Sequence, residues 1–161
     1  MLKSPMSSPA SNAGILEEQP GFYIRRLQQI AVAVFLEETQ AHGVTPVQYA
    51  ALYAVQRQPG LDQRTLAGVI GLDTSTLGGV IERLERRGLL TRQVAPGDRR
   101  MRLLHATPVG TDLLAAIEPA MRHAQQRMLA PLPPAERAQF LALLKQVVDG
   151  NNAHSRAPSD C

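Results

Sequence analysis

The sequence predicts a mainly helical protein that carries one small β-hairpin. Most of the chain has apolar residues spaced three and four apart, which is the period of a helix with one buried face. Only residues 89–106 are predicted to form extended strands, around a Pro-Gly turn. Aromatic residues make up 4% of the 161 residues and Trp is absent, so we expect one unit with a core of Leu, Val, Ile and Ala.

Composition and motifs narrow the class of protein. The one cysteine, Cys161, is the last residue, so the chain has no disulfide framework and no cysteine cluster for a metal. No apolar run reaches the length of a membrane span, and none near the start has the length of a secretory signal. The sequence contains no G-x-S-x-G, no H-E-x-x-H and no glycine-rich loop after a strand. We therefore expect a soluble, cytoplasmic protein that is not an enzyme and has no cofactor, catalytic or metal site.

Both ends of the chain are predicted to be disordered, at residues 1–19 and 151–161. The first segment is rich in Ser, Pro and Ala without a sustained period, and the last has the same character. The first helix is predicted from about Pro20 to Ala41, with Gly43 as its stop. Its apolar face consists of Leu27, Ile30, Ala31, Val34 and Phe35.

Three short helices follow, and turn chemistry delimits each of them. Thr45 and Asp73 are predicted N-caps of the first and the third of these helices, and glycine or Pro-Gly follows each of the three. The three are Thr45–Arg57, where Thr45 precedes a proline, Asp62–Ile70, which Gly71 closes, and Thr74–Arg87, which Asp73 caps and Gly88 ends. In the third helix the apolar positions i, i+3, i+4 and i+7 are Leu77, Val80, Ile81 and Leu84.

The β-hairpin comes next, and two further helices complete the prediction. The strands are Leu89–Val94 and Arg100–Ala106, joined by the turn Ala95–Asp98. Thr107-Pro108 opens a fifth helix that Pro119 should bend. Its coiled-coil-like seam consists of Leu114, Ile117, Met121, Ala124 and Met128. The sixth helix, Pro134 to about Val148, is expected to bury an edge made of Leu141, Leu144 and Val148.

Three short helices followed by a hairpin have the layout of a winged helix-turn-helix. The turn Gly71-Leu72-Asp73 is short and contains glycine, as the steep angle between two small helices requires. In this layout the helix Thr74–Arg87 lies in the major groove of DNA, and the hairpin is the wing. The order of elements therefore predicts a DNA-binding lobe over residues 45–106.

Positive charge gathers at the predicted recognition helix and wing. Residues 74–102 carry seven arginines against three carboxylates, and this excess of four (seven minus three) is larger than the net charge of +3 for the whole chain. The seven are Arg83, Arg86, Arg87, Arg92, Arg99, Arg100 and Arg102. Such clusters gain affinity for DNA by counterion release, and the planar guanidinium suits phosphate and guanine. For Arg86 and Arg87, an ordinary solvated helix face is the alternative.

The wing tip, residues 96–100, places two guanidinium groups on a tight turn. Asp98 is close enough in sequence to pair with Arg99 or Arg100 and to orient the other. Arginine on a narrow ribbon suits the minor groove, where narrowed A·T tracts concentrate negative potential. An ordinary charged hairpin turn is the alternative interpretation.

The residues of this region follow the signature of one family. Leu72-Asp73, the run 84–90, the run 96–100 and the run 106–110 have its order and spacing. Over roughly Gly21–Val148 the chain resembles the MarR (multiple antibiotic resistance regulator) family of winged helix-turn-helix transcriptional regulators. The resemblance implies a homodimer in which residues 20–44 and 107–150 form dimerisation helices. It also implies that two winged lobes read a pseudo-palindromic operator in double-stranded DNA.

The resemblance assigns roles to single residues. Asp98 and Arg100 take the wing positions, with Arg99 between them, and the groove-facing positions of the recognition helix are Thr74, Ser75, Thr76 and Arg83. Where many members carry a Thr-Arg pair, this chain has Gly78-Gly79, at a cost of about 1 kcal/mol per glycine relative to alanine. Either the bare backbone approaches the bases closely, or helix packing tolerates the glycines.

The resemblance also implies a response to a small ligand. The start of the first helix combines aromatic side chains with two arginines, as binding of a planar carboxylate requires. This start of the first helix resembles the branch of the family that controls aromatic-acid catabolism. We expect a repressor released by a hydroxynicotinate, hydroxycinnamate or benzoate compound; an activator, or a protein-interaction module without an effector, is the alternative.

The candidate ligand-binding residues are Tyr23, Arg25, Tyr49, Tyr53, His42 and His123. Tyr49 and Tyr53 are alternatively core aromatics, and Arg25 alternatively pairs with an acidic residue of the other subunit.

Overall fold

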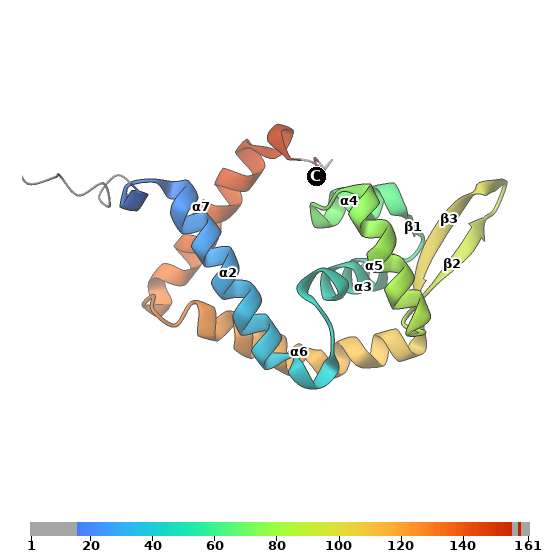
Figure 1. Cartoon of the computed structure of the whole chain (residues 1–161), viewed down its shortest axis with the longest axis horizontal. Coiled ribbons are helices and arrows are strands. Elements are labelled where there is room, and N and C mark those ends of the chain that lie inside the picture. The colour runs from blue at the N-terminus through green and yellow to red at the C-terminus, as the bar shows by residue number, and fades with distance from the viewer. Residues whose placement is uncertain (1–15, 156–157, 159–161) are drawn as a thin grey trace, which may run out of the picture.

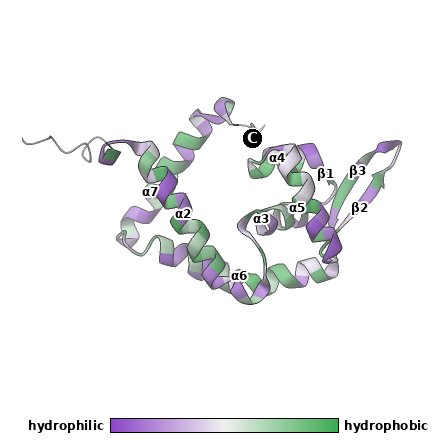
Figure 2. Ribbon diagram, viewed as in Figure 1, coloured by the Kyte–Doolittle hydropathy of each residue, from purple (hydrophilic) through white to green (hydrophobic). Residues whose placement is uncertain are grey.

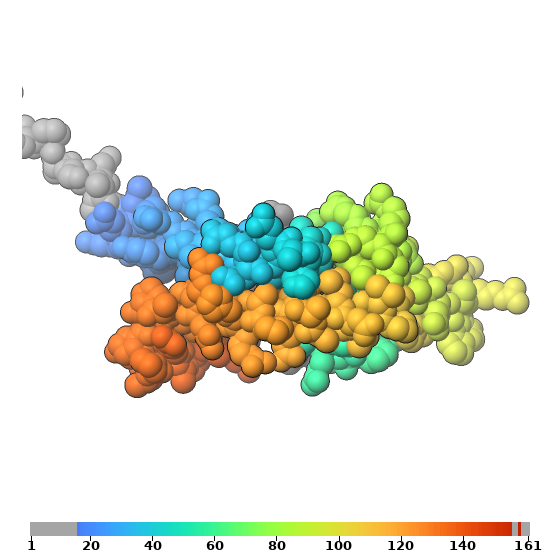
Figure 3. Space-filling model, turned by 90° about the horizontal axis from the view of Figure 1, so that it is seen from below, coloured from blue at the N-terminus to red at the C-terminus, as the bar shows by residue number. Residues whose placement is uncertain are grey.

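Two long helices, α2 and α6, connect the two ends of the molecule. The computed structural model describes residues 16–155 and Pro158, so most of the predicted disordered ends lies outside the described residues. Helix α2 (Pro20–Glu38) lies beside α6 (Pro108–Met128), and α6 continues beneath the winged lobe (Figures 1 and 3). This arrangement joins the lobe to the helices expected to form the dimer.

The first helix ends earlier than its sequence predicts. The expected end at Ala41 is wrong, because α2 stops at Glu38 and a 3₁₀ helix, η1 (Gln40–His42), follows. The Thr39 hydroxyl donates a 2.8 Å hydrogen bond to the carbonyl oxygen of Phe35, an i−4 contact that competes with continued helix. Gly43, at φ +60°, ends the segment in the left-handed conformation, as expected of the stop.

The winged lobe is built from α3 (Pro46–Arg57), α4 (Gln63–Ile70) and α5 (Thr74–Arg86). The N-caps predicted at Thr45 and Asp73 are confirmed, and Asp62, predicted as the first residue of its helix, is the N-cap of α4; each of the three side chains accepts from a backbone N–H three residues on. The four predicted apolar residues of α5 are all buried, in one core with residues of α3, α4 and the sheet. The buried members from α5 are Leu77, Val80, Ile81 and Leu84.

The wing belongs to a three-stranded antiparallel sheet. Its strands are β1 (Leu61–Asp62), β2 (Leu90–Ala95) and β3 (Asp98–Ala106), in the order β1-β3-β2. A register shift between Val94 and Ala95 places Ala95 opposite Asp98, so the turn is Pro96-Gly97 and not the predicted four residues. The hairpin projects from the lobe (Figure 1). Strand β1 was not predicted, because two residues show no period.

Helix α7 (Pro134–Gly150) contradicts one prediction about the core. Leu141 is 65% exposed, Val148 is 66% exposed, and Leu144 is only half-buried, so the expected buried edge is wrong for the single chain. An apolar edge is buried only where another layer covers it, and among the described residues no layer covers this one. Figure 2 shows apolar residues along α7 and α2, and Ile30 of α2 is also exposed.

Two smaller expectations concern the rest of the helical region. Helix α6 runs without interruption through Pro119, and of its predicted seam Leu114, Ile117 and Ala124 are buried. The tail expected to be disordered from Asn151 begins with a short 3₁₀ helix, η2 (Asn152–His154). No described helix combines the length and the apolar character needed to span a bilayer.

Candidate nucleic-acid interface

The first turn of α5 is held together by one carboxylate. Asp73 accepts hydrogen bonds from the hydroxyl of Ser75 at 2.6 Å, from the backbone N–H of Thr76 at 2.9 Å and from the hydroxyl of Thr76 at 2.7 Å. These bonds, that of Ser75 first, hold the pKa of the Asp73 carboxyl well below its ordinary range. The hydroxyl hydrogens of Ser75 and Thr76 are therefore engaged, and their oxygens remain as acceptors. Thr74 is exposed at the start of the helix.

The two glycines of α5 have different surroundings. A Cβ at Gly78 would lie 3.3 Å from Nε2 of Gln63, which donates a 3.0 Å hydrogen bond to the Thr74 carbonyl oxygen. Gly78 therefore makes room for the side chain that links α4 to α5, which favours the packing interpretation there. A Cβ at Gly79 would meet only the guanidinium of Arg83, at 3.6 Å. At Gly79 the close approach to bases remains a prediction.

The seven arginines of this region divide by their partners. Arg92 forms a 2.8 Å ion pair with Glu85, and Arg102 donates to the carbonyl oxygen of Arg99 at 2.7 Å. Two further arginines are bonded to backbone oxygens: Arg87 to those of His42 and Gly43, and Arg86 weakly to that of Glu82. Arg83, Arg99 and Arg100 are exposed and form no ion pair with another described residue. These three guanidinium groups are the ones available to a polyanion.

The wing tip differs from its prediction in one contact. The Asp98 carboxylate accepts a 2.8 Å hydrogen bond from the backbone N–H of Arg100, and it forms no ion pair with a guanidinium among the described residues. The predicted pairing with Arg99 or Arg100 is therefore wrong. A carboxylate that bonds a backbone N–H two residues on stabilises the turn itself, as Asx turns do. Both arginine side chains of the tip stay free as a result.

A hollow of about 640 Å³ separates the wing from the first turns of α4 and α5. Four arginines and two aspartates are among its lining residues, so its charge is positive. The ten are Asp62, Gln63, Arg64, Thr74, Arg92, Asp98, Arg100, Met101, Arg102 and Leu104. Sequence reasoning missed Gln63 and Arg64; the available signal was their position directly after the N-cap Asp62, beside the start of the recognition helix.

The first two candidate effector residues, Tyr23 and Arg25, lie near the start of α2. Tyr23, together with Arg26, lines an apolar groove of about 650 Å³ between α2, the end of α6 and α7, which we call the α2–α7 groove. Arg25 does not line it, and both guanidinium groups lie within 6 Å of the Phe22 ring, at 5.9 Å for Arg25 and 5.5 Å for Arg26. The sequence analysis therefore named Arg25, whereas the arginine that lines the groove is its neighbour Arg26.

The candidate tyrosines of α3 form a separate cluster. The Tyr49 ring lies 5.9 Å from Phe35 and is stacked on Tyr53 at 5.8 Å. Burial, followed by the charges of Tyr53 and Glu118, raises the pKa of the Tyr49 hydroxyl. Phe35 lies twelve residues after Tyr23 on the same helix, which corresponds to about 18 Å. A single chain therefore does not bring the two groups of tyrosines into one pocket.

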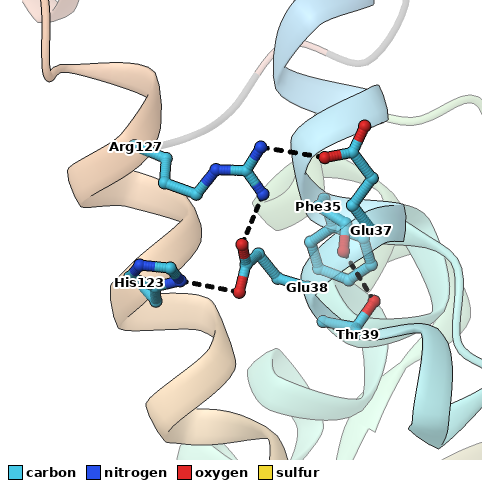
Figure 4. A network of polar contacts seen from close by, with 6 residues as sticks. All are labelled: Phe35, Glu37, Glu38, Thr39, His123 and Arg127. Carbon is cyan, nitrogen blue, oxygen red and sulfur yellow. Dashed lines mark hydrogen bonds and ion pairs between the residues drawn. The ribbon is translucent and has the colours of Figure 1, made fainter.

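The candidate histidines have structural partners. The Nδ1 atom of His123 lies 2.7 Å from a carboxylate oxygen of Glu38, and Arg127 pairs with both Glu38 and Glu37 (Figure 4). The hydrogen bonds from His123 and Arg127 lower the pKa of Glu38. This network joins α2 to α6. His42 is half-buried in η1, where its carbonyl oxygen bonds Arg87.

Comparisons with known proteins agree with this architecture. A family model described as the MarR family matches residues 42–101. A protein of Thauera aromatica, described as a putative transcriptional regulatory protein for the hcr operon, is 38% identical over 135 residues, which are 83% of this chain and 81% of that protein. The chain belongs to the MarR family. The relatives of this MarR protein are transcriptional regulators, not enzymes, and the predicted fold class is confirmed.

Two solved structures of similar proteins bear on what such regulators bind. One is BpsR of Bordetella bronchiseptica, described with the regulation of its DNA binding by 6-hydroxynicotinic acid; it is 32% identical, has a TM-score of 0.79, and the match covers 88% of this chain and 99% of that one. The other is the transcriptional repressor CouR of Rhodococcus jostii, bound to a 23-mer DNA duplex; it is 26% identical, has a TM-score of 0.80, and the match covers 86% and 99%.

Proposed function

We propose that this MarR protein is a repressor that binds a pseudo-palindromic operator as a homodimer and is released by a small aromatic acid. The observation that carries the DNA-binding part is the set of exposed guanidinium groups without an ion-pair partner in the described chain, on α5 and at the wing tip. Arg83 comes from the recognition helix, and Arg99 and Arg100 come from the wing. Their placement suits contact with phosphates and both grooves of a duplex.

The homodimer is supported by apolar surface that the single chain leaves uncovered. Leu141 and Val148 on α7 are both about two-thirds exposed, at 65% and 66%, and Ile24 and Ile30 of α2 are about half exposed, at 55% and 48%. Exposed apolar side chains gathered on a helix are typical of interaction sites. A second copy that covers them would also place two winged lobes on one assembly. Two lobes can then read successive major grooves, which lie about 34 Å apart on one face of the duplex.

The effector is proposed to be a planar aromatic carboxylate. The α2–α7 groove offers apolar walls, the Tyr23 ring and the Arg26 guanidinium, which together suit a ring that carries one negative charge. Tyr49 and Tyr53 offer a second aromatic surface, with Arg25, His42 and His123 as further candidates. Pairing of two chains is the route by which Tyr23 and Arg25 of one copy can approach Tyr49 and Tyr53 of the other. The similarity to BpsR supports hydroxynicotinate as the first compound to test.

The DNA-binding part is tested by the salt dependence of affinity. Fluorescence anisotropy with the duplex upstream of the protein's own gene should show affinity that falls steeply as salt rises. Replacing both Arg99 and Arg100 by alanine should weaken binding and make the slope shallower by about 0.9 for each lost phosphate contact. Arg122→Ala is the control, because Arg122 lies on α6, away from the wing, and its ion-pair partner among the described residues is Glu118. Equal slopes for the wild type and the wing variant would contradict the proposed interface.

The effector part is tested on the same complex. Addition of 6-hydroxynicotinate, 4-hydroxybenzoate or 4-hydroxycinnamate should release the duplex, whereas acetate should not. Release requires that the acid bind the free state more tightly than the DNA-bound state. If none of the three aromatic acids weakens DNA binding, the effector assignment fails and the DNA-binding proposal stands.

A further inference from the structure

The end of the recognition helix contacts the start of α6. After Arg87, the C-cap of α5, the chain turns at Gly88, whose φ is +68°. The hydroxyl of Thr107 donates to the Gly88 carbonyl oxygen at 2.6 Å, and its backbone N–H donates to that of Leu89 at 3.1 Å. Gly110, in the first turn of α6, packs against the same Leu89 carbonyl group. The recognition helix is therefore attached directly to one of the long helices.

The same end of α5 also contacts the segment that follows α2. Arg87 donates from Nη1 to the Gly43 carbonyl oxygen at 2.8 Å and from Nη2 to that of His42 at 3.1 Å. These oxygens belong to the last residue of η1 and to the glycine that follows it, and backbone carbonyl groups are strong acceptors that need a partner. The planar fork of arginine matches two acceptors at once. We call these two hydrogen bonds the Arg87 bridge; they join residues 44 and 45 positions apart.

We propose that Arg87 is a positioning residue for DNA binding, and that the Arg87 bridge fixes the orientation of the recognition helix relative to α2. Both Nη atoms of its guanidinium are already bonded to backbone oxygens. Arg87 also lies thirteen residues after Thr74, which corresponds to about 20 Å along α5 from the end that faces the hollow beside the wing. The bridge and the Thr107 contacts together attach α5 to both long helices, so the lobe turns with them as one unit. This inference rests on the proposed DNA binding.

The first test separates positioning from phosphate contact. Arg87→Gln should raise the Kd for the duplex about tenfold and leave the slope of log affinity against log salt unchanged. Arg83→Gln is the matched control, and it should make the slope shallower by about 0.9. Arg87→Lys keeps the charge but not the two-acceptor fork, so it should lose nearly as much affinity as Arg87→Gln. A shallower slope in Arg87→Gln, or near wild-type affinity in Arg87→Lys, would overturn the proposal in favour of a phosphate contact.

The second test measures how firmly the lobes are oriented. Operators whose half-sites are moved apart by one base pair should bind the wild type poorly, because half-site spacing must match the separation of the two lobes. Arg87→Gln should discriminate less between the two spacings, and amide hydrogen exchange should become faster in residues 40–44 and 86–89 together. Unchanged discrimination and unchanged exchange would refute the bridge. Failure of the wild-type protein itself to bind any duplex would instead refute the proposed function.

Discussion

Replacing Gly110 by alanine should destabilise the protein, although the change improves helix propensity. The added Cβ would lie 2.1 Å from the Leu89 carbonyl oxygen, 3.0 Å from the Leu89 carbonyl carbon and 3.2 Å from Cδ1 of Leu52. Leu89 and Leu52 are both in the buried core, at 4% and 1% exposure, so neither moves away freely. The first turn of α6 must therefore shift away from the lobe, which also weakens the hydrogen bond from Thr107 to Leu89.

The magnitude follows from three opposing contributions. Alanine gains about 1 kcal/mol over glycine within a helix. Overpacking of a core costs about 1–3 kcal/mol or more, and loss of a hydrogen bond costs about 1 kcal/mol. Because the clash at Gly110 is with backbone, we take the upper part of this range, and we expect a net loss of about 2–3 kcal/mol in the free energy of unfolding.

The matched variant is Gly79→Ala, also within a helix. Its Cβ would meet only the flexible end of Arg83, at 3.6 Å, so this variant should gain up to about 1 kcal/mol in the free energy of unfolding. Urea unfolding followed by circular dichroism measures both changes, at one protein concentration because dimerisation adds to apparent stability. If Gly110→Ala is as stable as the wild type, or moves in the same direction as Gly79→Ala, the close packing of α6 on the lobe is wrong.

Three further predictions concern charged groups. The carboxyl of Asp73 has a lowered pKa, so its stabilising effect is present above the ordinary pKa of about 3.8 and is lost as pH falls below it; the difference in unfolding midpoint between the wild type and Asp73→Asn should shrink between pH 5 and pH 2. Asp98→Ala should weaken DNA binding several-fold in anisotropy titrations, whereas Asp98→Asn, which still accepts from the Arg100 N–H, should retain most of it; equal losses would contradict the turn-stabilising role. Arg127→Gln should lower the melting temperature at low salt and do so less at high salt, because its ion pairs between α2 and α6 are screened.

The sequence alone determined the three helices of the lobe, because their limits depend on contacts between near neighbours. Thr45, Asp62 and Asp73 each cap a helix through a residue three positions away, so the signal and its effect lie in one short window. The spacing of apolar residues on α5 likewise identified a face that is buried. Asp98 shows the limit of such reasoning. The sequence indicated that its carboxylate interacts within the wing tip, but not that the donor would be the backbone N–H of Arg100 in place of a guanidinium group.

Only the tertiary structure decided which charged and aromatic residues are free for function. Arg87 belongs to the same basic run as Arg83 and looks equivalent in sequence, yet its acceptors are contributed by residues 42 and 43. In the sequence Tyr23 and Tyr49 look like one aromatic group, but the structure places them apart. Tyr23 lies near the start of α2, whereas Tyr49 of α3 contacts Phe35 near the other end of α2. Partners brought together by folding leave no local pattern, so a sequence shows where a helix begins but not what its side chains meet across the molecule.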